Sequence, residues 1–377
     1  MGLIHSPRIV TDGLVLCLDA GNTKGYDKFE NLLRYSEDFS NNSWIKQNGF
    51  SITSNTAIAP DGTLTADTAS RVNLSSEYLY QAYGGTGTFT LSCWVRAVTG
   101  TTTFVMSSYN GVDGSIASQT FTATTTWQRF SHTATVTTTN SWYPCIPSVS
   151  GAQLYIWGAQ LERGSSVNDY YATTSTAKTR GTSWGDLSGN GNNGTLTNGP
   201  TYSSSNGGSI VFDGTNDYIV RNPTTIDLSA GVTMEMIFKS TDMNSRAQGF
   251  MQYNASGGYY INFYTPGNGR LRWETWVPVS VAGGAFYTPT ALSNNTWYHA
   301  VGTYSSGSSK LYINGINVSS ASQTSGTYSS SYTGNLQIGQ YAGYMSGNVA
   351  IAKIYNRVLT AEEIQQNFNA LRSRFGI

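Results

Sequence analysis

Short segments in which apolar and polar residues alternate run through most of the chain. The clearest is "KLYINGINVSS" at residues 310–320, where alternating stretches flank Asn314 and Gly315. Alternation is typical of strands with one buried face, and an Asn-Gly pair between two such stretches is typical of a two-residue type I′ turn. We therefore predict a β-hairpin at this position.

The same pattern recurs through the C-terminal half, with Gly, Asn and Ser between the segments. Short strands at this spacing indicate a β-sandwich or jelly roll. The segments are 207–220, 231–240, 257–265, 269–277, 295–306, 335–341 and 348–359.

A single helix is predicted at the C-terminus. Thr360 and Glu363 have the spacing of a capping box, and Leu359 and Ile364 that of a hydrophobic staple. Apolar residues then recur on one helical face as far as Phe375. This periodicity predicts that the helix packs on the sheet.

Residues 29–180 contain a second set of strand-like segments, and no amphipathic run of helix length interrupts them. The stretch 172–184, at the end of this set, is polar and poor in apolar residues, which predicts a linker.

The composition agrees with an all-β fold and limits the possible partners. Charged residues make up 11% of the chain, against about 25% in an average protein. Lys plus Arg and Asp plus Glu number 21 each, so no overall field attracts nucleic acid. No apolar run is long enough to span a membrane, and the first residues lack the features of a signal peptide. We therefore expect no nucleic-acid partner and no membrane insertion.

The three cysteines, Cys17, Cys93 and Cys145, are widely spaced in strand-like sequence. We interpret them as buried thiols, with a disulfide between Cys93 and Cys145 as the alternative.

Seven motifs, in order, resemble the concanavalin A-like jelly roll of the laminin G-like type, over residues 8–27 and 181–377. This version is similar to domains in structural proteins of tailed phages, especially marine ones. The motifs are "GLVLCLDAGN", "WGDLSGNGNNGTLTNGP", "SIVFDGTNDYIV", "TMEMIFK", "NTWYHAVGTY", "KLYINGINV" and "IAKIYNRVLTAEEIQQNFNALRSRFGI".

In that pattern a short loop joins the first two motifs, whereas here a long insertion separates them, between Tyr26 and Trp184. The inserted segment resembles β-sandwich carbohydrate-binding modules of phage fibre and spike proteins, from "NLLRYSEDFSNNSWIKQNGF" to "LYIWGAQLERGS". The predicted fold is all-β: a jelly roll of residues 1–27 plus 181–377, an inserted β-sandwich of residues 28–180, and one C-terminal helix. We also predict that strand 13–19 pairs with strand 349–356.

Catalysis is not expected, although glycosidases use jelly rolls of this type. Glycoside hydrolysis needs two carboxylates roughly 5–10 Å apart, which on one strand means acids at alternate positions. The corresponding strand 233–238 contains only Glu235, which we interpret as a solvated or ion-paired residue. His132 and His299 are interpreted as packing or surface residues.

Two loops carry clustered side-chain oxygens of the kind that Ca²⁺ accepts. Asp and Asn beside Gly are also the residues that turns require, so a purely structural role remains the alternative. The candidate Ca²⁺ ligands are Asp186, Asn190, Asn192, Asp213, Asn216 and Asp217.

Sugar binding without catalysis needs exposed aromatic rings together with amide, carboxylate or guanidinium groups. Trp94, Trp127 and Trp157 lie in strand-like sequence and are expected in the core. The candidates in the insertion are Tyr78, Tyr80 and Tyr83, together with Trp142 and Tyr143 in an expected loop. The candidates in the jelly roll are Tyr259, Tyr264, Trp276, Tyr341 and Tyr344.

The resemblance implies a protein of the phage virion surface, either a head decoration or fibre or a tail accessory, that binds host glycans without catalysis. It would be made in the host cytoplasm and released by lysis, with other virion proteins and further copies of itself as partners. The alternative is a structural capsid decoration or cement protein without a glycan ligand. A polysaccharide hydrolase is a third alternative, which the missing carboxylate pair disfavours.

Overall fold

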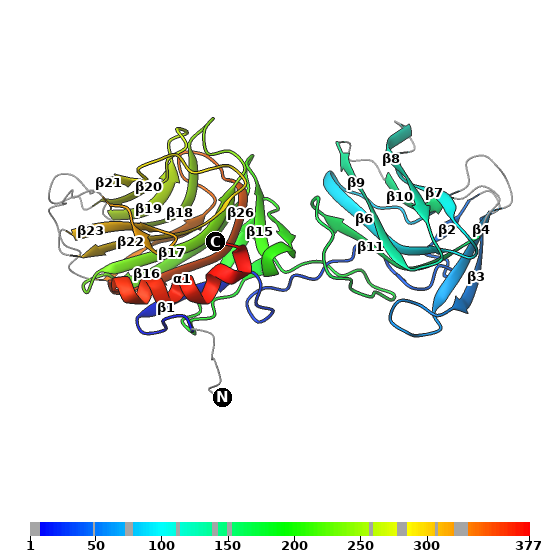
Figure 1. The fold of residues 1–377 in the computed structure, drawn as a ribbon, viewed down its shortest axis with the longest axis horizontal. Coiled ribbons are helices and arrows are strands. Elements are labelled where there is room, and N and C mark those ends of the chain that lie inside the picture. The colour runs from blue at the N-terminus through cyan, green and yellow to red at the C-terminus, as the bar shows by residue number, and fades with distance from the viewer. Residues whose placement is uncertain are drawn as a thin grey trace. The chain divides into compact units, whose positions relative to one another are not determined.

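The chain folds into two compact β-rich units (Figure 1). The split unit consists of Met1–Lys28 and Gly181–Ile377, and the inserted unit of Phe29–Arg180. Both are built from antiparallel sheets, and the described residues contain one α-helix, so the predicted fold class is confirmed. The computed structural model describes residues 8–47, 50–71, 78–110, 114–137, 142–148, 153–255, 259–276, 285–305, 308–319 and 331–377.

The first sheet of the split unit, which we call the helix-side sheet, has eight strands. Its path runs β14-β15-β26-β17-β22-β23-β24, and β1 also pairs with β26. Leu16 and Leu18 of β1 lie opposite Ile354 and Ala352, which confirms the predicted pairing of the first strand with the last. The strands are β1 (Leu14–Asp19), β14 (Thr201–Ser203), β15 (Ser209–Asp213), β17 (Val232–Ser240), β22 (Trp297–Ser305), β23 (Ser308–Ile313), β24 (Ile316–Asn317) and β26 (Ser346–Tyr355).

The second sheet of the split unit, which we call the outer sheet, also has eight strands, in the order β12-β13-β16-β25-β18-β19-β20-β21. They are β12 (Ser183–Trp184), β13 (Gly194–Thr197), β16 (Tyr218–Asp227), β18 (Gln248–Ala255), β19 (Tyr259–Thr265), β20 (Arg272–Trp276), β21 (Ala285–Tyr287) and β25 (Ser331–Ile338).

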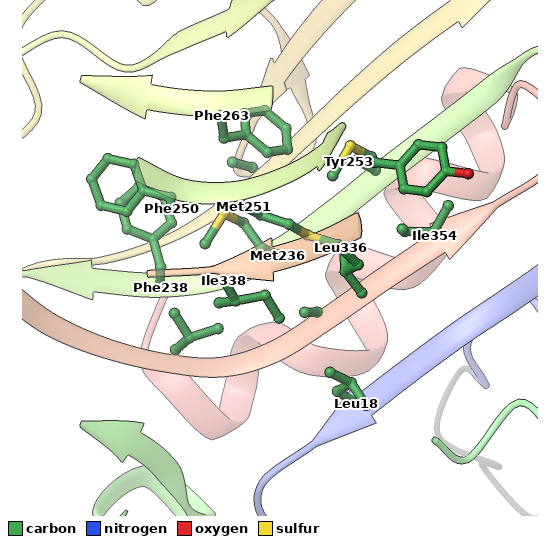
Figure 2. Close-up of a cluster of buried hydrophobic side chains, with 14 of the residues drawn as sticks. Leu18, Met236, Phe238, Phe250, Met251, Tyr253, Phe263, Leu336, Ile338 and Ile354 are labelled. Carbon is green, nitrogen blue, oxygen red and sulfur yellow. The ribbon is translucent and has the colours of Figure 1, made fainter. Parts of the chain in front are cut away.

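The core of the split unit lies between these two sheets (Figure 2). Met236 and Phe238 of β17 meet Phe250 and Met251 of β18 there, and all four are at most 1% exposed. Ile237, which points to the opposite face of β17, is also fully buried. The helix-side sheet is therefore covered on both faces.

Helix α1 (Ala361–Phe375) provides the second cover of the helix-side sheet (Figure 1). Thr360 and Glu363 form the predicted capping box, and Ile364 and Phe375 are buried against the sheet, so the helix prediction is confirmed. No helix in the described part of the chain is both long and apolar enough to cross a membrane.

Two further sequence predictions for the split unit are confirmed. Asn314 and Gly315 both adopt positive φ, 49° and 77°, in the hairpin between β23 and β24, as a type I′ turn requires. Cys17 is a free, buried thiol, and burial raises its pKa to about 11.

The inserted unit has two five-stranded sheets with the orders β3-β4-β11-β6-β9 and β2-β5-β10-β7-β8. Cys93 is free and buried in the core between them, as predicted. The strands are β2 (Ile45–Lys46), β3 (Phe50–Ala57), β4 (Ala66–Arg71), β5 (Leu79–Tyr80), β6 (Gly87–Ala97), β7 (Thr102–Asn110), β8 (Gly114–Ala123), β9 (Gln128–Val136), β10 (Trp142–Ser148) and β11 (Gln153–Arg163).

The segment predicted as a linker, 172–184, is not free. Thr173 donates hydrogen bonds to Ser36 and to the carbonyl of Leu33, and Lys178 forms a β-bridge with Asn31. Residues 172–180 are therefore part of the inserted unit, and the linker prediction is wrong there. The missed signal is that polar Thr and Ser side chains can hold an irregular segment on a unit by hydrogen bonds, as apolar side chains do by burial.

Candidate functional site

The outer sheet carries the most developed candidate site of the split unit on the face turned away from the core. Met251, Ile261 and Trp273 point into the core, so the residues that alternate with them point outward. Together with side chains from the loop after β25, these outward residues form what we call the aromatic face. Its members are Gln252, Tyr260, Asn262, Tyr264, Arg272, Glu274, Trp276, Tyr287, Gln337 and Tyr341.

A line of rings crosses the aromatic face. Tyr260 and Trp276 lie opposite each other on β19 and β20, with centroids 6.0 Å apart and planes only 5° apart. Tyr341 lies 6.5 Å from Tyr260 and 5.2 Å from Tyr264, centroid to centroid. Trp276 is 37% exposed, whereas burial raises the pKa of Tyr260 to about 12. The rings therefore form a partly sheltered apolar surface that remains open at Trp276.

Arg272 is fixed beside these rings. Its Nη2 lies 2.5 Å from Oε1 of Glu274, and its Nη1 donates a hydrogen bond to the hydroxyl of Tyr264. Its guanidinium carbon lies 5.1 Å from the centroid of Tyr264 and 5.4 Å from that of Tyr287. Burial raises the pKa of Glu274, and the charge of Arg272 partly offsets this effect. The pair thus offers ordered hydrogen-bonding groups next to an aromatic surface.

Asn262 lies among these groups on β19 and is 0% exposed. It is close enough to Glu274 and Tyr341 to help lower their pKa values, against the larger effect of burial. Its Nδ2 and Oδ1 lie near these two groups but outside good hydrogen-bond geometry. Asn262 is therefore a buried polar group beneath the rings, next to Glu274 and Tyr341.

The structure brings together several of the jelly-roll residues that the sequence singled out. Tyr264, Trp276 and Tyr341 all belong to the aromatic face, and the hydroxyl of Tyr344 accepts a hydrogen bond from Gln340 at 3.4 Å. The side chain of Tyr259 lies outside the described residues.

Sequence reasoning missed Tyr260, Asn262 and Arg272. The signal was present in "YYINFYT", where Tyr260, Asn262 and Tyr264 are alternate residues and must share one face of a strand. The sequence alone does not show which face of this strand is exposed, because that depends on the position of the helix-side sheet.

The candidates of the inserted unit have different surroundings. Tyr78 stacks on Tyr109 with centroids 6.3 Å apart. Tyr83 packs edge-on against Phe89 and is partly buried against the core. Tyr80 belongs to β5, where it pairs with Ile45 of β2.

Trp142 and Tyr143 lie in strand β10, so the prediction that they occupy a loop is wrong. Strand β10 pairs with both β5 and β7, and this long-range pairing is not visible in the local sequence. The side chains of both residues lie outside the described part of the structure.

Glu235 is an ion-paired residue, one of the two roles considered for it. Its Oε1 lies 2.8 Å from Nζ of Lys353 and 3.1 Å from Nε2 of His299, and its Oε2 accepts a hydrogen bond from Asn367 of α1. All four residues are at most 1% exposed. Burial acts to raise the pKa of Glu235, but Lys353 and His299 hold it at about 2. This cluster lies beneath α1 and serves the packing of the helix.

The first loop with candidate Ca²⁺ ligands is tied to β1. The carboxylate of Asp186 accepts hydrogen bonds from the backbone N–H groups of Cys17, Ser188 and Asn192 and from the Ser188 hydroxyl, at 2.8–3.0 Å. The amides of Asn190 and Asn192 donate to the carbonyls of Leu14 and Val15. These contacts match the structural alternative for this loop.

The second loop is also held by local hydrogen bonds. Asp213 accepts from the N–H of Thr215, and Asp217 accepts from the N–H of Asp213 at 3.0 Å. The carbonyl of Asn216 accepts from the side chain of Asn198. Burial raises the pKa of Asp217 to about 7. Among the residues that the structure describes, no three His, Cys, Asp or Glu side chains gather as metal ligands, and Ca²⁺ binding stays a prediction.

Replacing Asp186 distinguishes a structural role of its loop from Ca²⁺ binding. We expect Asp186→Ala to lower the free energy of unfolding by about 1–2 kcal/mol, because it leaves backbone N–H groups of β1 and the loop without an acceptor. Urea denaturation with and without Ca²⁺ measures this effect. A Ca²⁺-dependent gain in stability that the variant loses would instead assign a metal to the loop.

The comparisons with known proteins agree with this fold. Residues 213–365 match the family Laminin_G_3, described as the concanavalin A-like lectin/glucanases superfamily. The split unit carries a concanavalin A-like domain. The matched residues include every strand of the aromatic face, and they do not reach the inserted unit. No curated protein matches the chain significantly.

Solved structures are similar only at a distance. The binding domain of Paraclostridial Mosquitocidal Protein 1 is 19% identical, over 49% of each chain, with a TM-score of 0.40. Domain 4 of AbnA, a GH43 extracellular arabinanase from Geobacillus stearothermophilus solved with arabinotriose, is 17% identical over 48% of this chain and 91% of its own, with a TM-score of 0.37. Since this chain spans about half of the first of these structures and both TM-scores are low, neither likeness carries an argument about function.

Proposed function

We propose that the concanavalin A-like domain binds a carbohydrate on the aromatic face. The observation that carries this proposal is the line of rings that ends at the exposed Trp276. Aromatic rings stack on the C–H faces of sugar rings, and a few fixed polar groups bond the hydroxyls. Arg272 and Glu274 supply such groups in a fixed arrangement.

The proposed binding is non-catalytic. Glu274 is the only acidic residue in strands β18 to β21, and it is held by Arg272. Hydrolysis of a glycosidic bond by the usual route needs a second carboxylate across the sugar. Glu235 cannot supply it, because it is buried beneath α1 on the other sheet.

We further propose that the protein acts on the surface of a phage virion, where the domain would bind glycans of the host. This part of the proposal is supported by the sequence motifs alone, from "GLVLCLDAGN" to the C-terminal helix.

Binding of the full chain to an array of bacterial surface glycans tests the proposal. We expect Trp276→Ala to weaken binding at least tenfold, because it removes the most exposed ring of the face. Tyr171→Ala is a matched control, since Tyr171 is also 37% exposed but belongs to the inserted unit. Binding that survives Trp276→Ala would contradict the proposed site. No binding to any glycan would favour the structural decoration protein.

A further inference from the structure

The inserted unit has a second group of aromatic side chains that the sequence had placed in the core. Cys93 and Val95 of β6 point into the core, so the residue between them, Trp94, points away from it. Trp94, Trp127 and Trp157 belong to a cluster separate from the main core of the unit. Trp157 is buried, as predicted, whereas Trp94 and Trp127 are only partly buried, so the core prediction is wrong for these two. Alternation assigns residues to two faces but does not say which one is covered.

Arg96 lies at the centre of this group. It is opposite Tyr155 in the pairing of β6 with β11, and its guanidinium carbon is 4.6 Å from the ring centroid of Tyr155 and 5.1 Å from that of Trp127. Within the described ranges Arg96 has no ion pair or hydrogen bond. Its Nε and the Nε1 of Trp94 are both buried donors without an acceptor. The sheet thus presents an uncompensated cation held between two rings.

The loop from Ile58 to Thr65 carries exposed apolar side chains beside these rings. Trp127 donates a hydrogen bond to the carbonyl of Ile58 at 3.0 Å, and Trp157 donates to the hydroxyl of Thr65 at 3.0 Å, which fixes both ends of the loop. Ile58 and Leu64 are 53% and 58% exposed. Exposed apolar side chains therefore lie in the loop that is bonded to Trp127 and Trp157.

We propose that Trp94, Arg96, Trp127 and Tyr155, which we call the anion face, bind an anionic saccharide. Sugar rings would stack on the aromatic side chains, and a carboxylate or sulfate would pair with the guanidinium of Arg96. An apolar protein partner fits less well, because it would bury the charge of Arg96 without a counter-ion. The anion face and the aromatic face belong to different units, so this proposal does not rest on the proposed function of the jelly roll.

Calorimetric titration of the full chain with defined oligosaccharides tests the anion face. The probes are oligogalacturonate, its neutral methyl ester, and dextran sulfate compared with dextran, which separate carboxylate, sulfate and neutral ligands. We expect at least one anionic probe to bind at least tenfold more tightly than its neutral counterpart, with an affinity that falls as salt is added.

Variants locate the binding. Arg96→Met keeps the aliphatic stem and should lower the affinity for the anionic probe at least tenfold. Trp127→Ala should lower this affinity by a similar factor. Arg34→Met removes the same charge from an exposed position of the same unit and should leave the affinity within twofold. The loss caused by Arg96→Met should be equally large in a Trp276→Ala background, which separates binding at the anion face from binding at the aromatic face.

Three results would overturn the proposal. They are equal affinity for charged and neutral probes, unchanged binding by Arg96→Met whose circular dichroism shows it to be folded, and no binding of any probe. Sedimentation that shows self-association of the wild type, lost in Arg96→Met and Trp127→Ala, would assign the face to a protein partner instead.

Discussion

Lys353→Met is expected to lower the free energy of unfolding by about 3–5 kcal/mol, because it leaves the fully buried carboxylate of Glu235 without its closest cation. Methionine keeps most of the volume of the lysine stem, so the loss reflects charge more than packing. Equilibrium denaturation in urea, followed by far-ultraviolet circular dichroism, measures the change.

The double variant Glu235→Gln/Lys353→Met is the control for this interpretation. Removing both charges should recover most of the stability, since a buried ion pair is often worth little more than a neutral replacement. A double variant as unstable as Lys353→Met would show that packing, not charge, causes the loss.

The same ion pair predicts a pH dependence. The pKa of Glu235 is about 2 in the folded protein, below its ordinary value of 4.5. Its contribution is therefore present above pH 4.5 and is lost as the pH falls toward 2, because protonation removes the attraction to Lys353. The contribution should be smaller in Lys353→Met, which repeating the denaturation between pH 3 and pH 7 would detect.

Gly302→Val is expected to destabilise the split unit by at least about 3 kcal/mol. A Cβ at position 302 of β22 would lie only 2.2–2.5 Å from three atoms of the indole ring of Trp273, which comes from the opposite sheet and is fully buried. Trp273 is also held by a hydrogen bond to Ser309, so it cannot move away easily. Since Arg272 and Glu274 flank Trp273 on β20, the variant should also weaken sugar binding on the aromatic face.

Gly84→Val is the matched control, because a Cβ there meets nothing within 4 Å and the position lacks the left-handed conformation that favours glycine. Its free energy of unfolding should change by less than about 1 kcal/mol. A similar loss in both variants would show that the flexibility of glycine, rather than the clash with Trp273, is the cause.

Local chemistry made several features of the fold predictable from the sequence. The turn at Asn314 and Gly315 needs positive φ, and the start of α1 needs the hydroxyl of Thr360, so residue type alone indicates both. The pairing of β1 with β26 followed from the order of the family motifs.

The candidate site was harder to predict, because it depends on which face of each sheet is covered. Tyr264 and Trp276 were chosen as candidates from their loop or strand-end position, but only Trp276 is exposed, and Tyr264 is buried beside it on the same face. The role of Asn262 depends on its burial next to Glu274, which the sequence does not show. Trp94 illustrates the opposite error, since a large apolar residue in a strand was expected in the core and instead lies on the outward face. Such assignments need the long-range pairing of strands, which local patterns do not contain.

Hydrogen exchange of the full chain, with and without the oligosaccharide that binds best on the array, tests the central claim most directly. We predict that the bound sugar slows exchange of backbone amides in β19 and β20, around Tyr260 to Trp276, and that Trp276→Ala abolishes this protection. Binding without any protection in these strands, or protection confined to other strands, would contradict the assignment of the sugar site to the aromatic face.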